Sequence, residues 1–246
     1  MVKTSILRIS NVEYGYKKNR KILNKISFNA YSGEIIGILG ENGSGKSTLL
    51  KLLVGLLKPQ KGTIQYAGKV GYCPQDIQLF DHLTVAEHFK LFGVGQNYNN
   101  QTILEKQAYF LDKLKFEKYK NELVFNLSGG TKQKLNLSLA LFADPDILLL
   151  DEPYQGFDYE TFTKFWDLQK DLRSQNKTIL IVSHIIEDRT KLDRIITLRN
   201  GYSTYCEPEC QCSSCIGESQ PPCGSDCTCA SCRDERMNIS VPEIMN

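Results

Sequence analysis

Short apolar runs broken by polar positions open this chain and predict β-strands at residues 7–12, 22–28 and 34–39. From Lys46 onward, leucines recur at helical spacing until the Pro- and Gly-containing segment 58–62, so we expect a helix that this segment stops. A glycine-rich loop lies between the last strand and this helix. A helix N-terminus that faces such a loop offers free N–H groups and a positive dipole end to a phosphate.

Strand-like and helix-like patterns continue to alternate through the rest of the chain. The expected strands are 68–73, 147–150, 178–183 and 194–198, and the expected helices are 84–92, 102–123, 131–142 and 159–174. This alternation is typical of an α/β protein with a mostly parallel sheet.

The glycine-rich loop, G-E-N-G-S-G-K-S-T at residues 40–48, matches the P-loop pattern G-x-x-x-x-G-K-[ST]. Its glycines let successive backbone N–H groups converge on phosphate oxygens. Lys46 would neutralise the β- and γ-phosphates, and Ser47 would offer its hydroxyl to Mg²⁺. The candidate nucleotide-binding residues of this loop are Gly40, Asn42, Gly43, Ser44, Gly45, Lys46, Ser47 and Thr48.

Asp151 and Glu152 directly follow the expected strand at 147–150. Ligands of open parallel sheets bind beyond the carboxyl ends of the strands, which places both carboxylates beside the P-loop. Asp151 is a candidate Mg²⁺ ligand, and Glu152 is a candidate general base that activates the attacking water. The alternative for both residues is an acidic strand end that caps the helix after it.

Further motifs follow the P-loop in a fixed order, namely Gln75, L-S-G-G at 127–130, I-L-L-L-D-E at 147–152, Asp158 and His184. On these motifs, residues 5–204 resemble the nucleotide-binding subunit of ATP-binding cassette (ABC) transporters. The resemblance implies an ATPase that uses ATP and Mg²⁺. It also implies that Ser128, Gly129 and Gly130 bind the γ-phosphate held by a second cassette, so that two ATP molecules join two copies of the chain as a homodimer.

The predicted fold class is therefore α/β, with a P-loop NTPase core, a mostly parallel sheet, an N-terminal antiparallel β region and an inserted helical subdomain. We expect the ATPase domain to span residues 1–205 and the helical insert to span about 76–143. We expect residues 206–246 to form a separate cysteine-rich tail.

The resemblance also assigns roles to single side chains. Gln75 would contact Mg²⁺ or the attacking water, His184 would contact the γ-phosphate, and Tyr16 would stack on adenine. Each role has a simpler alternative. Gln75 could be an ordinary polar loop residue, His184 could be a hydrogen-bonded core histidine, and either Tyr16 or its neighbour Tyr14 could pack in the core.

The chain departs from the usual family pattern at Tyr154, Gln155 and Phe157, where Thr, Ser and Leu are common, and at Thr131, where Gln is common. These departures leave the candidate catalytic residues unchanged. They bear on how the two subunits signal to each other. They also leave open whether the partner cassette is identical to this chain.

Net charge and the lengths of the apolar runs bear on the partners and location that we expect for this chain. The chain of 246 residues has a net charge of +2, which gives no electrostatic reason to expect nucleic acid as a partner. It has no signal-peptide pattern and no apolar run of the ~20 residues that a membrane span needs. We therefore expect a protein of the cytoplasmic face of the cell membrane, bound peripherally to a separate integral membrane permease.

The segment 79–93 resembles its counterpart in bacterial drug and peptide exporters, where it receives a coupling helix of the membrane subunit. This favours export as the direction of transport. One alternative is a soluble ABC ATPase of the assembly type, as in iron–sulfur biogenesis. Another is a cassette that uses ATP only as a switch, although Glu152 and His184 argue against lost hydrolysis.

Eight of the nine cysteines lie near the C-terminal end, in two copies of C-x-x-x-C-x-C-x-x-C. They are Cys206, Cys210, Cys212 and Cys215 in the first copy and Cys223, Cys227, Cys229 and Cys232 in the second. Four thiolates per copy suit a tetrahedral Zn²⁺ or a shared thiolate cluster. The alternatives are an iron–sulfur cluster and a disordered appendage with reactive thiols.

Overall fold

The computed structural model describes residues 4–17, 20–183 and 189–206. Its strands are β1 (Ser5–Tyr14), β2 (Leu23–Tyr31), β3 (Ile35–Leu39), β4 (Lys61–Tyr66), β5 (Val70–Cys73), β6 (Ile147–Asp151), β7 (Thr178–Val182), β8 (Arg194–Arg199) and β9 (Tyr202–Cys206). Its α-helices are α1 (Lys46–Leu53), α2 (Val85–Gly95), α3 (Asn100–Lys113), α4 (Gly129–Phe142) and α5 (Tyr159–Ser174). Short 3₁₀ helices cover Glu117–Tyr119, Val124–Asn126 and Arg189–Lys191.

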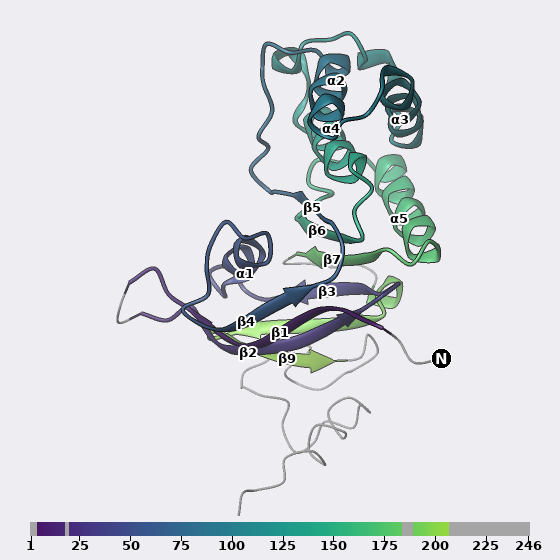
Figure 1. Cartoon of the computed structure of the whole chain (residues 1–246). Coiled ribbons are helices and arrows are strands. Elements are labelled where there is room, and N and C mark those ends of the chain that lie inside the picture. Colours follow the sequence, from purple (N-terminus) through teal and green to yellow (C-terminus); the bar gives the residue numbers. More distant parts are fainter. Residues whose placement is uncertain (1–3, 18–19, 184–188, 207–246) are drawn as a thin grey trace, which may run out of the picture.

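Two sheets confirm the predicted fold class. The larger has six strands in the order β5-β6-β7-β3-β8-β9, parallel except for β9, which pairs antiparallel with β8. The smaller has the order β2-β1-β4 and is antiparallel. In Figure 1, α2, α3 and α4 form a lobe above the sheets, and α1 stands apart from that lobe. No helix among the described residues is both long enough and apolar enough to cross a membrane.

The parallel strands supply side chains to two hydrophobic cores. All five residues of β6 and of β7 are buried. Leu148 and Leu150 pack with the helical lobe and α5, whereas Ile147 and Leu149 pack with α1 and the antiparallel sheet. Because successive strand side chains point to opposite faces, one apolar run serves both cores and holds the ends of the strands rigidly.

The prediction of one helix over residues 102–123 is wrong. Helix α3 ends at Lys113, and Lys115 follows with φ 55°. The Phe116 N–H donates to the Leu111 carbonyl and the Lys115 N–H donates to the Asp112 carbonyl, which is the hydrogen-bond pattern of a Schellman termination. Leu111 and Phe116 are both buried, so the helix end is fixed by an apolar contact that the helical periodicity did not reveal.

One other boundary differs from the predictions, and two strands were not predicted. Helix α1 ends at Leu53, several residues before the Pro- and Gly-containing segment, because Gly55 has φ 77° and turns the chain out of the helix. Strands β4 and β9 were not predicted. The residues of β4 are mostly exposed, and an exposed edge strand lacks the apolar alternation that identifies a strand.

Candidate functional site

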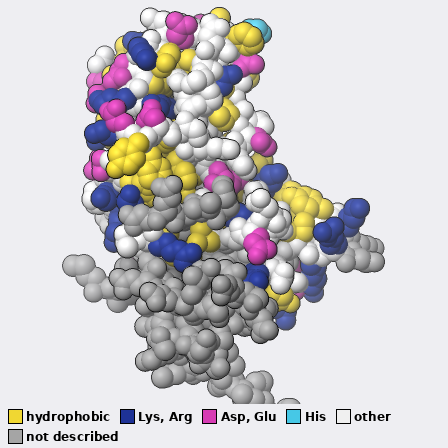
Figure 2. Space-filling view, turned by 180° about the vertical axis from the view of Figure 1, so that it is seen from behind, with side chains coloured by type: hydrophobic (Ala, Val, Ile, Leu, Met, Phe, Trp, Pro, Cys, Tyr) yellow, Lys and Arg dark blue, Asp and Glu magenta, His cyan; other side chains and the backbone are white. Residues whose placement is uncertain are grey.

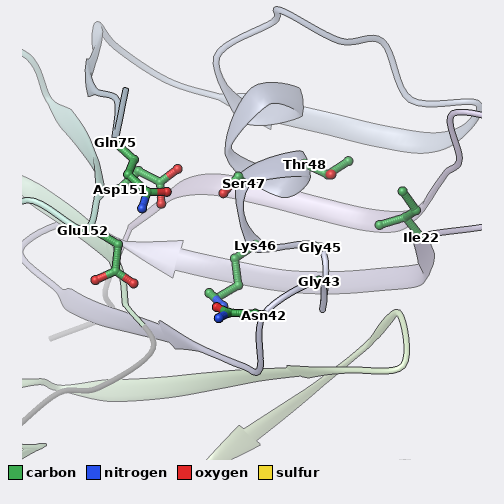
Figure 3. A pocket seen from close by; sticks show the side chains of 10 residues that line it. All are labelled: Ile22, Asn42, Gly43, Gly45, Lys46, Ser47, Thr48, Gln75, Asp151 and Glu152. Carbon is green, nitrogen blue, oxygen red and sulfur yellow. The ribbon is translucent and has the colours of Figure 1, made fainter. Parts of the chain in front are cut away.

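A cavity of about 380 Å³ lies where the P-loop, the start of α1 and the end of β6 meet (Figure 3). Its lining residues are Ile22, Asn42, Gly43, Gly45, Lys46, Ser47, Thr48, Gln75, Asp151 and Glu152. Gln75 and Asp151 lie side by side and face Ser47, and Glu152 comes from the same strand end as Asp151. The structure thus brings residues from four parts of the sequence to one cavity.

The first backbone N–H groups of α1 receive no side-chain cap. Its N-cap, Gly45, has φ 103° and provides no side-chain cap. By contrast, the other α-helices among the described residues are capped by their own side chains, those of Thr84, Asn99, Ser128 and Asp158. The first N–H groups of a helix have no partner within the helix. At α1 they face the cavity, where they can bind an anion such as a phosphate.

Lys46 is one of the residues that line the cavity. Its Nζ donates to the carbonyl oxygens of Gly40 at 2.6 Å and Glu41 at 3.0 Å. Burial lowers the pKa of Lys46, and the charges of Glu152 and Asp151 oppose this effect. The ammonium group is therefore held over the loop by carbonyl oxygens, with two carboxylates near enough to favour its charged form.

Asp151 is 3% exposed. Burial raises the pKa of its carboxyl group, the hydrogen bond from Ser47 acts in the opposite direction, and the Glu152 charge raises the pKa further. Mg²⁺ in nucleotide sites is held by one or two carboxylates, together with phosphate oxygens and water. The Asp151 carboxylate and the Ser47 hydroxyl fit that need, because both offer oxygen atoms and face each other beside the N-terminus of α1.

Glu152 has an unusual backbone. Its φ is 48°, in the left-handed region, and its N–H donates to the Val182 carbonyl at 2.9 Å. The Ser183 hydroxyl donates to Glu152 Oε2 at 2.9 Å. A non-glycine residue in this region costs about 1 kcal/mol or more and often marks a functional site. Here the strained backbone and the serine fix the direction of the carboxylate.

Ser183 and Ile22 were not identified from the sequence. Ser183 follows β7, and β7 pairs in parallel with β6, so the two strand ends bring Ser183 next to Glu152. Strand order could have suggested this contact, since parallel neighbours end at the same edge of the sheet. Ile22 carries no such signal, because an apolar residue before a strand looks like any core residue.

Tyr16 stands at the rim of the site. It is 57% exposed, and its hydroxyl lies 3.4 Å from Thr48 Oγ1. Its ring meets that of Tyr14 edge to face, at 5.3 Å between centroids. Tyr14 packs against the core that contains α1, so of the two tyrosines Tyr16 is the one with a free ring surface.

Other predicted residues are not in the cavity. Ser44 lines an adjoining depression with Arg20 and Arg199, and this depression shares Ile22, Asn42 and Gly43 with the cavity. Gly40 packs below the loop, where a Cβ would lie 2.5 Å from the Leu198 carbonyl oxygen. Ser128, Gly129 and Gly130 begin α4 and are at least partly exposed. None of these three lines the cavity.

Two further predictions cannot be placed. His184 and the cysteines from Cys210 to Cys232 lie outside the described residues, as does the side chain of Cys206. Among residues 4–17, 20–183 and 189–206, no cluster of three or more His, Cys, Asp or Glu side chains could hold a metal ion. The zinc prediction thus gains no support from this part of the chain.

Comparison with known proteins decides the family. The profile described as ABC transporter matches residues 23–155. An ABC transporter ATP-binding protein of Methanocaldococcus jannaschii is 35% identical over 191 residues, which cover 77% of this chain and 73% of the relative. The chain belongs to the ABC transporter family.

Other members of the ABC family carry more specific names. The Nod factor export ATP-binding protein I of Burkholderia orbicola is 36% identical over 204 residues, covering 78% of this chain and 67% of the relative. A metal transport system ATP-binding protein of Thermotoga maritima is 38% identical over 184 residues, which cover 74% of this chain and 75% of the relative.

A solved dimeric ATP-binding cassette, in a post-hydrolysis state with ADP and Pi, matches the fold with a TM-score of 0.76. It is 26% identical and covers 83% of this chain and 99% of that chain. This chain is thus an ABC ATPase subunit of a transporter, and it binds and hydrolyses ATP.

Proposed function

We propose that ATP binds with its triphosphate in the cavity beneath the N-terminus of α1 and with its adenine on Tyr16. The uncapped helix end carries this proposal, since among the described α-helices the N-terminus of α1 is the one without a side-chain cap. Lys46 neutralises the β- and γ-phosphates. Ser47 and Asp151 hold Mg²⁺, with Gln75 beside them. When bound, Mg²⁺ compensates the charge that develops on the phosphates.

Glu152 acts as the general base in this proposal. Its carboxylate lies in the same cavity as Lys46 and is oriented by Ser183, so it can align a water and accept its proton as the water attacks the γ-phosphate. Glu152→Gln should still bind ATP and should lose turnover by about 10² to 10⁴-fold. Phosphate release and nucleotide binding are measured separately. Near-normal turnover of this variant would remove Glu152 from the role.

The segment 128–130 completes the site of a second copy. It lies outside its own chain's cavity and is at least partly exposed, which supports a function in trans, and a solved relative of the same fold is dimeric. Two identical copies would then enclose two ATP molecules. Sedimentation of the Glu152→Gln variant with Mg²⁺ and ATP should show dimers. Monomers at every concentration would contradict this part of the proposal.

The transporter function proposed here is export through a separate integral membrane subunit, with the ATPase bound to it at the cytoplasmic face of the membrane. The likeness to an exporter ATPase supports the direction, although a metal transport ATPase is about equally similar. Affinity purification from detergent-solubilised membranes should recover an integral membrane protein. Recovery of soluble partners alone would favour an ATPase of the assembly type.

The cysteine repeats support a separate proposal for residues 206–246. Eight thiols in two equal patterns of four suit a thiophilic metal such as Zn²⁺. Elemental analysis of protein purified under reducing conditions should find metal, and deletion of residues 207–246 should remove it. Full-length protein without metal would contradict the proposal and leave nucleotide binding untouched.

A further inference from the structure

Two buried amide side chains on α4 reach across to the segments that carry Gln75 and Glu152. Asn136 Nδ2 donates to the carbonyl oxygen of Pro74 at 2.9 Å. Gln133 Nε2 donates to the carbonyl oxygen of Pro153 at 3.1 Å. Pro74 directly precedes Gln75, and Pro153 directly follows Glu152. One helix therefore makes a side-chain hydrogen bond to the backbone next to each of these two residues.

These hydrogen bonds are costly to lose. Asn136 is 7% exposed and Gln133 is 3% exposed, and both accepting carbonyls lie just beyond the ends of β5 and β6, where the sheet ladder no longer supplies donors. A carbonyl shielded from water and left without a donor destabilises the fold. The two loops are therefore held in place by side chains of a helix that is distant from them in sequence.

The two amides also bind each other and share a neutral neighbour. Asn136 Nδ2 lies 3.4 Å from Gln133 Oε1 and 3.3 Å from Cys73 Sγ. Burial raises the pKa of the Cys73 thiol, so the thiol stays protonated at neutral pH. The cluster is thus uncharged, and its geometry does not depend on a titration near pH 7.

The backbone of α4 packs closely against β5 at one end and against the loop after Glu152 at the other. A Cβ at Gly71 in β5 would lie 2.5 Å from the Ala140 carbonyl oxygen, near the C-terminal end of α4. At the other end, a Cβ at Gly130 would lie 2.3 Å from the Gly156 oxygen. Backbone packed this closely leaves little room for α4 to move toward β5 or toward the loop after Glu152 without displacing them.

We propose that Asn136 and Gln133 are positioning residues, through which the position of the segment 128–130 determines the positions of Gln75 and Glu152. When residues 128–130 of this chain close on the nucleotide of a second copy, α4 sets the alignment of Gln75 and Glu152 in this chain's own site. The proposal rests on the function proposed above for these residues. It extends that function by naming the contacts through which closure of one site aligns the other.

The test compares Asn136→Ala with Ser138→Ala in the full-length protein. Ser138 is a matched control, because it is buried on the same helix and its hydroxyl bonds to the Lys134 carbonyl of α4 itself at 2.8 Å. We expect Asn136→Ala to lower kcat about tenfold with KM for ATP nearly unchanged. Ser138→Ala should leave kcat within about twofold of the wild type.

A double-mutant cycle separates positioning from general destabilisation. If Asn136 acts through the Gln75 segment, its replacement by Ala should have little further effect on kcat in a Gln75→Ala background. Additive losses of kcat, or equal losses in Asn136→Ala and Ser138→Ala, would overturn the proposal. Failure of the proposed function itself would show in a different place, as normal turnover of Glu152→Gln.

Discussion

Gly130 and Gly156 touch so closely that a Cβ on Gly130 would lie 2.3 Å from the backbone oxygen of Gly156. Gly130 belongs to the first turn of α4, and Gly156 lies in the loop after Glu152 with φ 79°. The contact joins the exposed 128–130 segment to the loop of the general base. Its neighbour Gly129 is different, because a Cβ there would meet nothing within 4 Å.

Gly130→Ala should therefore destabilise the fold. The new methyl group meets backbone, which cannot turn aside as a side chain can, and overpacking of this kind costs about 1–3 kcal/mol. Thermal or chemical unfolding should show the loss. A free energy of unfolding equal to that of the wild type would mean that the α4 start and the 156 loop separate readily.

Gly129→Ala should instead keep the fold and lose activity. Alanine is a better helix former than glycine by about 1 kcal/mol, and its methyl group has space within the chain, so the melting temperature should be unchanged or higher. If a second copy's nucleotide occupies that space, ATP hydrolysis should fall and nucleotide-driven dimerisation should weaken. Wild-type turnover would contradict a role of 128–130 in trans.

Ser183→Ala should lower kcat about tenfold with little change in ATP affinity, because the hydroxyl hydrogen bond to Glu152 Oε2 orients the base without touching the P-loop. Steady-state hydrolysis at saturating MgATP and a separate binding titration measure the two quantities. Ser174→Ala is a suitable control, since its hydroxyl bonds to the Asp171 carbonyl in an exposed helix end. Unchanged kcat would show that other contacts suffice to hold Glu152.

Asp151 predicts a pH dependence of Mg²⁺ binding. Its pKa is raised by burial, and Mg²⁺ binds the deprotonated carboxylate. Apparent Mg²⁺ affinity for the ATP complex should therefore fall as pH decreases through this raised pKa, starting at a higher pH than for an exposed aspartate. Titrations across the acid range test this. An unchanged affinity would contradict the assignment of Asp151 as a ligand.

The same shift has the opposite consequence for stability. An acid with a raised folded-state pKa contributes most to stability when protonated, and this contribution is lost as pH rises through the folded pKa. Asp151→Asn should therefore raise the melting temperature at neutral pH while weakening Mg²⁺ binding. Asp112→Asn is the control, because Asp112 is exposed and the hydrogen bond from Lys115 lowers its pKa. Equal effects of the two substitutions would contradict the argument.

Gln169 offers a test of stability away from the site. It is fully buried in α5, and neither its Nε2 nor its Oε1 has a hydrogen-bond partner among the described residues. Methionine has a similar length and no amide to desolvate, so Gln169→Met should raise the free energy of unfolding by about 1–2 kcal/mol. The exposed Gln101→Met is the control, with an expected change within about 0.5 kcal/mol. Destabilisation by Gln169→Met would show that the amide is hydrogen-bonded, for example to a buried water.

Local spacing in the sequence determined the identities of the P-loop residues, the carboxylates after β6 and most strands and helices, because these follow from patterns within a few residues. The Ser183 hydrogen bond to Glu152 and the hydrogen bond from Asn136 to the Pro74 carbonyl required the tertiary structure. Each depends on a contact between segments that only folding brings together. The sequence identified which side chains can do the chemistry. The positions of the groups that orient those side chains were decided by packing between distant parts of the chain.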